Sequence, residues 1–110
     1  MDIQQHIHEQ VTTHPVVLYM KGTPQFPQCG YSANTANILR ACGVSDLFSV
    51  NLLIEHEIRE GIKQYASWPT IPLVFINGQF IGGADITRDL YQSGELQKML
   101  AGITAEQPAA

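Results

Sequence analysis

The chain has 110 residues, of which 45% are hydrophobic, so we expect one globular domain with a single core. The formal net charge is −4 and the six basic residues are scattered singly, which argues against a nucleic-acid partner. No apolar stretch approaches the roughly 18 residues of a membrane span, and the N-terminus lacks the basic start and apolar block of a signal peptide. We therefore expect no membrane association and a cytoplasmic location.

The first half of the chain alternates between helix and strand signals. Apolar residues recur every four positions over residues 3–13, which predicts an amphipathic helix. The continuous apolar run 16–20 predicts a strand buried on both faces. A helical pattern over 33–42 precedes an alternating segment, 48–52, which we place as a second strand parallel to the first through a right-handed crossover.

The second half predicts a helix, a hairpin and a last helical region. Helical spacing marks residues 55–66, and two apolar runs then flank Asn77-Gly78, a strong local signal for a β-hairpin. The last helical region is interrupted at Gly94, and the domain is expected to end at residue 102 with a flexible tail over 103–110. Six apolar side chains of this region are expected to face the core: Ile86, Leu90, Tyr91, Leu96, Met99 and Leu100.

The segment between the first strand and the following helix carries the chemistry. It reads Lys-Gly-Thr-Pro-Gln-Phe-Pro-Gln-Cys-Gly-Tyr-Ser over residues 21–32 and places Cys29 at the start of a helix. Backbone N–H groups are unpaired there and the helix dipole favours negative charge, which lowers the pKa of a thiol. Lys21 adds a nearby cation. We therefore predict a reactive thiolate at Cys29; the alternative is a small inert residue at a helix cap.

The other cysteine, Cys42, lies on the apolar side of the same helix and is expected to be a core residue. A helix of 13 positions holds the two cysteines about 20 Å apart, whereas a disulfide needs Cα atoms within about 7 Å. Ser32 stands three residues after Cys29, so a Cys-x-x-Cys redox pair is absent as well. The sequence thus predicts one thiol that works alone.

The loop from Met20 to Ser32 resembles the active-site loop of monothiol glutaredoxins, with Tyr31 where the family usually has phenylalanine. The resemblance extends over about residues 3–101. It implies an α/β, thioredoxin-like fold: a four-stranded mixed sheet flanked by helices.

The resemblance also implies a glutathione site beside Cys29. Pro72 would follow a cis peptide bond and leave the backbone of Ile71 to pair with the cysteinyl unit of the tripeptide. The same bond in an ordinary protein would only stiffen a loop that leads into a strand. Lys21 and Arg59 match the family's basic positions for the glycyl carboxylate, although Arg59 and Lys63, four residues apart, could simply form a solvated helix face.

The γ-glutamyl end of glutathione is assigned by the resemblance to residues 82–85. Gly83 and Ala84 would present backbone N–H groups to a carboxylate, and Asp85 would meet the ammonium group. An aspartate after two glycines is otherwise a common helix N-cap. The family often has cysteine at Ala84, so this chain lacks a second thiol there.

A lone thiolate can ligate a soft metal centre or attack a disulfide. An all-sulfur 2Fe-2S cluster needs four thiolates, of which two chains supply only two. The resemblance implies that two glutathiones supply the others, that the cluster joins a homodimer and passes to acceptor apoproteins, and that BolA-like proteins are partners. The alternatives are a glutathione-dependent oxidoreductase acting through a Cys29 mixed disulfide, and an interaction domain without redox chemistry.

Overall fold

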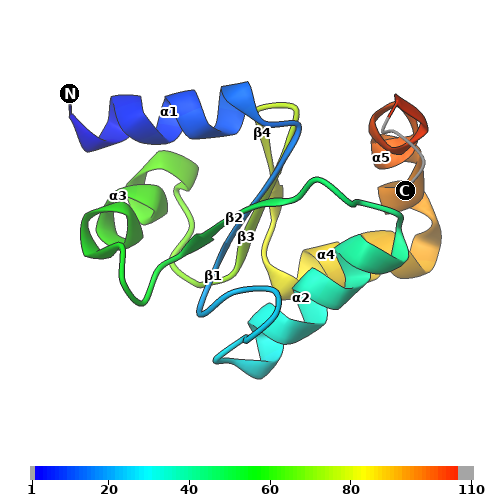
Figure 1. Cartoon of the computed structure of the whole chain (residues 1–110), viewed down its shortest axis with the longest axis horizontal. Coiled ribbons are helices and arrows are strands. Elements are labelled where there is room, and N and C mark those ends of the chain that lie inside the picture. The colour runs from blue at the N-terminus through cyan, green and yellow to red at the C-terminus, as the bar shows by residue number, and fades with distance from the viewer. Residues whose placement is uncertain (1, 107–110) are drawn as a thin grey trace.

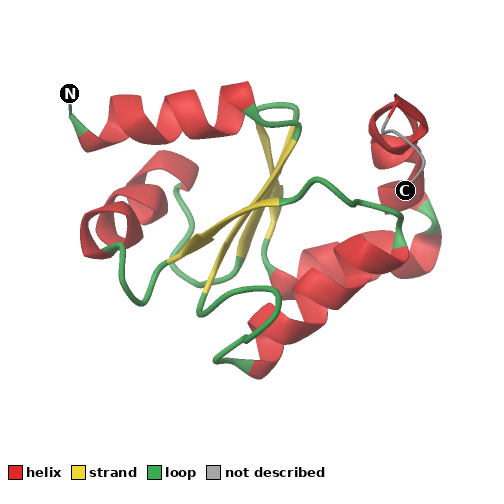
Figure 2. Ribbon diagram, viewed as in Figure 1, coloured by secondary structure: helices red, strands yellow, loops and turns green. Residues whose placement is uncertain are grey.

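A computed structural model describes residues 2–106 and has a four-stranded mixed sheet at its centre (Figures 1 and 2). The strands are β1 Val16–Met20, β2 Phe48–Asn51, β3 Leu73–Ile76 and β4 Gln79–Gly82. Their order across the sheet is β2-β1-β3-β4. The pair β1–β2 is parallel, whereas β3 runs antiparallel to both β1 and β4. The predicted parallel pair, the hairpin and the mixed sheet are therefore confirmed.

Helices cover both faces of this sheet. They are α1 Ile3–Thr13, α2 Gly30–Ala41, α3 His56–Ala66, α4 Ala84–Ser93 and α5 Glu95–Glu106. Helices α1 and α3 lie on one face, and α2, α4 and α5 lie on the other (Figure 1). The arrangement confirms the predicted thioredoxin-like α/β fold, with helices contributed to each face by segments far apart in the sequence.

Alternate side chains of β1 enter two cores on opposite faces of the sheet. Val16, Leu18 and Met20 pack with α2 and α5, whereas Val17 and Tyr19 pack with α1 and α3. All five are fully buried, as the continuous apolar run predicts. Burying a Val, Leu or Met side chain stabilises a fold by about 1.5–3 kcal/mol. This short central strand therefore contributes to both cores at once and holds its C-terminal end, where the Cys29 loop begins, in a fixed place.

The C-terminal region departs from the prediction at three points. Ile86 and Met99 were expected to face the core, but they are 37% and 39% exposed; Thr87 is the buried residue of α4. Helix α5 continues through residues 103–106, which were assigned to a flexible tail, because Ile103 extends the apolar side of the helix and packs on the core. Residues 107–110 lie outside the described part of the chain.

The loops at the C-terminal ends of β1 and β2 are tied together by one side chain. The Oδ1 atom of Asn51 accepts hydrogen bonds from the backbone N–H groups of Gly22 and Leu53, each at 3.0 Å.

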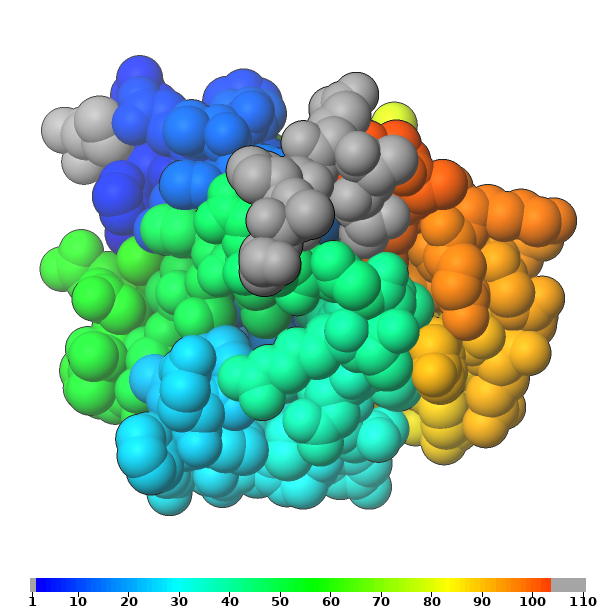
Figure 3. All heavy atoms as spheres, turned by 45° about the vertical axis from the view of Figure 1, so that its right-hand side comes forward, coloured from blue at the N-terminus to red at the C-terminus, as the bar shows by residue number. Residues whose placement is uncertain are grey.

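In Figure 3 the segment that precedes α2, drawn in light blue to cyan, protrudes at the lower left of the molecule. Within residues 2–106, no helix has the length and hydropathy to cross a membrane.

Candidate functional site

Cys29 is placed by a tight loop that leaves β1 and returns to the start of α2. Gly22 and Pro27 form an isolated β-bridge, and the N–H of Gln28 donates to the carbonyl of Lys21 at 2.9 Å. Gly22 has a φ of +90°, which glycine adopts at no steric cost. Cys29 follows as the N-cap residue of α2, with extended backbone and a carbonyl that accepts from the N–H of Ala33. The predicted position of the thiol at a helix start is confirmed.

This position lowers the pKa of the Cys29 thiol below its ordinary value. The main cause is a hydrogen bond from the backbone N–H of Ser32, and the N–H of Tyr31, the Ser32 hydroxyl and the charge of Lys21 act in the same direction. Partial burial opposes them. Ser32 itself is fully buried, and its Oγ accepts from the N–H of Lys21 at 3.1 Å, so its proton is free for the sulfur. The helix start thus stabilises a thiolate.

Cys42 occupies the opposite end of α2 in a different environment. It is the C-cap residue, it packs against the core, and burial raises the pKa of its thiol. Both cysteines are free. The predicted contrast between a reactive Cys29 and a structural Cys42 agrees with these two environments.

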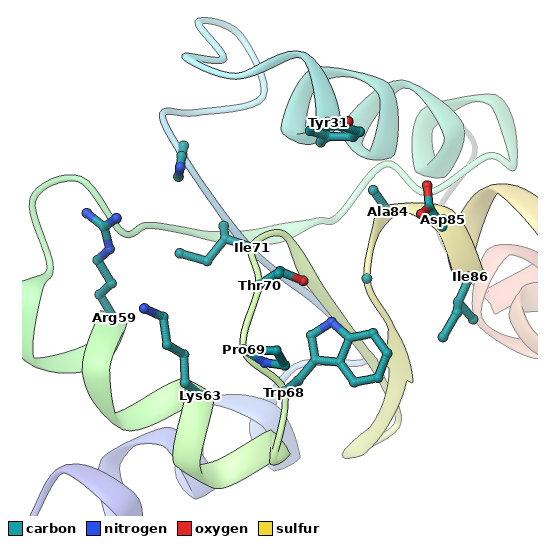
Figure 4. A pocket seen from close by; sticks show the side chains of 12 residues that line it. Tyr31, Arg59, Lys63, Trp68, Pro69, Thr70, Ile71, Ala84, Asp85 and Ile86 are labelled. Carbon is teal, nitrogen blue, oxygen red and sulfur yellow. The ribbon is translucent and has the colours of Figure 1, made fainter.

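A groove with a volume of about 700 Å³ runs beside the Cys29 loop (Figure 4). Lys21, Arg59 and Lys63 line it, and none of the three makes an ion pair with another described residue. Asp85 lies across the groove, at the start of α4. The groove therefore carries unpaired positive charge on one side and a carboxylate on the other.

The wall between these charges is built from the segment that joins α3 to β3. Ile71 lines the groove, and the peptide bond between Ile71 and Pro72 is cis, as the resemblance implied. Trp68 lies below it, and its buried Nε1 has no hydrogen-bond partner among the described residues. A Cβ atom on Gly83 would come within 3.0 Å of this Nε1 and 3.3 Å of the carbonyl oxygen of Pro72. The start of α4 can thus approach the wall because residue 83 has no side chain.

A second hollow, of about 460 Å³, continues past Asp85 between α2 and α4. Cys29 and Arg88 line this hollow, and Tyr31, Ala84 and Asp85 are common to it and the groove. The ring of Tyr31 is 66% exposed, so it forms the rim between the two. Cys29 therefore lies beside the groove and forms part of the wall of the second hollow.

The structure brings the predicted site residues to one place. Those that line the groove are Lys21, Arg59, Ile71, Gly83, Ala84 and Asp85, while Cys29 lines the adjoining hollow and Pro72 is buried behind Gly83. The lining residues that sequence reasoning missed include Lys63, Trp68 and Tyr31 in the groove and Arg88 in the adjoining hollow. The four-residue spacing of Arg59 and Lys63 is the available signal for Lys63, but the same spacing is equally typical of a solvated helix face, so the sequence places only Arg59 in the site.

One thiolate is the strongest soft-metal ligand at the site. In the described part of the chain, no three His, Cys, Asp or Glu side chains lie close enough to hold a metal ion together. The donor set therefore fits a metal centre only if further thiolates come from outside the chain. A single activated thiol, a cis-proline wall and a charged groove on this sheet define a thioredoxin-like protein of the one-cysteine class.

Comparison with known proteins identifies the family within this class. The Glutaredoxin family matches residues 16–81. A monothiol glutaredoxin of Synechocystis, described as ycf64-like, is 50% identical over 94 residues, which cover 86% of this chain and 87% of that protein. The structure of reduced apo GrxS14 from poplar has a TM-score of 0.79 and 43% identity and covers 94% of each chain. A buckwheat glutaredoxin–glutathione complex has a TM-score of 0.79 and 26% identity, covering 91% of this chain and 88% of the other. The chain belongs to the monothiol glutaredoxin family.

Proposed function

We propose that two copies of this chain and two glutathione molecules hold a 2Fe-2S cluster, which the protein delivers to acceptor apoproteins. The observation that carries this proposal is the single activated thiol of Cys29 beside a charged groove. Four thiolates complete an all-sulfur cluster, and each chain offers one. Glutathione is an abundant small thiol that could supply the other two.

The groove fits the charges of glutathione, which has two carboxylates and one ammonium group. In this proposal Lys21 and Arg59 bind the glycyl carboxylate, and the backbone of Ile71, held by the cis bond to Pro72, pairs with the cysteinyl unit. Lys63 adds a third cation at the glycyl end, where the described structure gives it no ion-pair partner. The related buckwheat protein was solved in complex with glutathione, which supports a site for this tripeptide.

The γ-glutamyl end would then reach the start of α4. Backbone N–H groups of Gly83 and Ala84 would receive its carboxylate, because a helix N-terminus favours negative charge. Asp85, which is exposed in the first turn, would bind its ammonium group. Bound in this direction, the glutathione thiol would lie next to Cys29, and both sulfurs would be available to the same iron centre.

Delivery follows from how the ligands are held. Two of the four thiolates belong to molecules bound without covalent bonds to the protein, so they can be exchanged for the thiolates of an acceptor. The exposed rim around Cys29 leaves this exchange open to other proteins, and we include BolA-like proteins among the partners that share the cluster. The cytoplasmic location expected from the sequence remains part of the proposal.

Reconstitution tests the shared-ligand arrangement. Apo-protein should be a monomer, and iron, sulfide and glutathione should convert it to a dimer that holds two iron atoms and two glutathiones. Cys29→Ser should abolish cluster binding, whereas Cys42→Ser, the matched control at the other end of α2, should retain it. Sedimentation combined with iron and glutathione analysis measures these values. A cluster that forms equally well on a monomer, or with no added thiol, would refute the proposal.

The lowered pKa of Cys29 also favours a second function, glutathione-dependent reduction of mixed disulfides. The Cys29 thiolate would attack the glutathione sulfur of a protein–glutathione disulfide and release the protein thiolate. Ser32 cannot resolve the resulting Cys29 adduct, so a second glutathione thiolate would attack it, forming oxidised glutathione and restoring Cys29. Turnover of a glutathionylated peptide by apo-protein, which carries no cluster, tests this activity apart from cluster transfer, and Cys29→Ser should abolish the turnover.

A further inference from the structure

Arg88 occupies a position in the second hollow that the proposed function does not yet use. It lies one turn after Asp85 on α4, its side chain is 47% exposed, and its Nη1 is 3.6 Å from Oδ1 of Asp85. Its Nε and Nη2 atoms donate to Oδ1 of Asp89 at 3.3 Å and 3.2 Å. Of the described residues that line the hollow, Arg88 is the only basic one.

The chemistry of the γ-glutamyl group indicates which ligand group Arg88 can bind. The end of glutathione that reaches Asp85 is a free α-amino acid, with an ammonium and a carboxylate on the same carbon. Asp85 matches the ammonium alone. Arg88 adds a full positive charge beside Asp85. The groove and the second hollow meet at Asp85, so a ligand held by Asp85 lies at the mouth of the second hollow, which Arg88 lines.

We propose that Asp85 and Arg88 act as a pair that recognises the zwitterionic α-amino-acid end of glutathione, with Arg88 binding its carboxylate. This inference rests on the proposed glutathione site and names a specificity residue within it. Arg88 would act together with the backbone N–H groups at the start of α4, which carry only partial charge.

The guanidinium group is free to take this role. It has five N–H donors, and only those on Nε and Nη2 are used by Asp89. The contact to Asp85 at 3.6 Å is longer than a hydrogen bond, so the N–H groups of Nη1 are available to a ligand oxygen while Nε and Nη2 stay on Asp89. Because both partners are well exposed, the existing ion pair contributes little that a ligand would have to replace.

The test combines a protein variant with a ligand variant. Calorimetry would measure the affinity of reduced glutathione and of 4-aminobutyryl-cysteinyl-glycine, which keeps the ammonium and lacks the α-carboxylate. Arg88→Gln should weaken glutathione binding about two- to fivefold, a size set by the solvent exposure of the contact. It should leave the affinity of the analogue unchanged, and Arg88→Lys should restore part of the affinity for glutathione.

Lys98→Gln is the matched control. Lys98 forms an ion pair with Glu95 at 3.5 Å, with the same three-residue spacing on the neighbouring helix α5, but it lines neither hollow. It should alter neither affinity. An equal loss for both ligands in Arg88→Gln, or no loss for either, would overturn the inference alone. Absence of glutathione binding to the wild-type protein would overturn the proposed function and this inference with it.

Discussion

Gly22→Ala should disrupt the Cys29 loop more severely than the addition of one methyl group suggests. A Cβ atom at residue 22 would lie 2.5 Å from the carbonyl oxygen of Phe26 and 2.8 Å from the N of Gln28. Real Cβ contacts do not come below 3.0 Å. Both contacting atoms belong to the backbone of the same loop, so no side chain can move aside. The loop must open, and the bridge to Pro27 that positions Cys29 is lost.

Gly94→Ala supplies the scale for this effect. Gly94 has a φ of +86°, close to the +90° of Gly22, but nothing lies within 4 Å of its Cβ position. Its substitution therefore reports the conformational cost alone, about 1–2 kcal/mol for a left-handed residue. At about 4–8 °C per kcal/mol, the melting temperature should fall by roughly 4–16 °C. Gly22→Ala carries the same cost plus the loss of the loop contacts, so it should melt no higher than Gly94→Ala.

Two measurements separate the variants. Thermal unfolding followed by circular dichroism gives the stabilities, and calorimetry gives the affinity for glutathione. Gly22→Ala should lose glutathione binding because Lys21 and Cys29 flank the opened loop, whereas Gly94→Ala should keep it. If Gly22→Ala bound glutathione as tightly as Gly94→Ala, the loop would not be the element that positions Lys21 and Cys29 for glutathione binding.

Two further predictions concern the thiols. Ser32→Ala removes one hydrogen bond to the Cys29 sulfur and keeps the N–H donors, so the pKa of Cys29 should rise part of the way to its ordinary value. The pH midpoint of alkylation by iodoacetamide should move upward, and Thr35→Ala, which removes another buried hydroxyl of α2, should leave it unchanged; equal midpoints in both variants would contradict the assigned cause. Oxidised glutathione should add one glutathione to Cys29 and leave Cys42 free, as read by mass spectrometry, and a disulfide between the two in folded protein would contradict the helix that separates them.

The sequence alone predicts the structure correctly where local signals and tertiary structure agree. The five-residue apolar run of β1, the Asn77-Gly78 turn and the placement of Cys29 at a helix start all depend on short-range chemistry, and all are found. The cis bond at Pro72 was implied only by the family resemblance, since nothing in the local sequence distinguishes cis from trans.

The residues that sequence reasoning misplaced depend on how distant segments meet. Lys63 lies one turn from Arg59 on α3, and only the approach of α4 to the Trp68 wall makes that helix face part of a groove. Ile86 has a helical apolar spacing, but it packs against Gly82 and lines the groove, whereas Thr87, one residue on, is buried and donates its hydroxyl to the carbonyl of Gly83 at 2.8 Å. The sequence does contain a signal that α5 continues to residue 106, because Leu96, Leu100 and Ile103 share one side of a helix. The small residues around Ile103 make this segment look like an unstructured tail.

The side chain of Asn51 has a consequence for protein engineering. Its one oxygen accepts from the loop that carries Cys29 and from the loop that leads to α3 and Arg59, so the two loops share an anchor that neither contains. Residues 21–29 transplanted into another scaffold of this fold would leave the N–H of Gly22 without its acceptor. A working graft therefore has to include an asparagine at the end of the second strand, 29 positions beyond Gly22 in the chain.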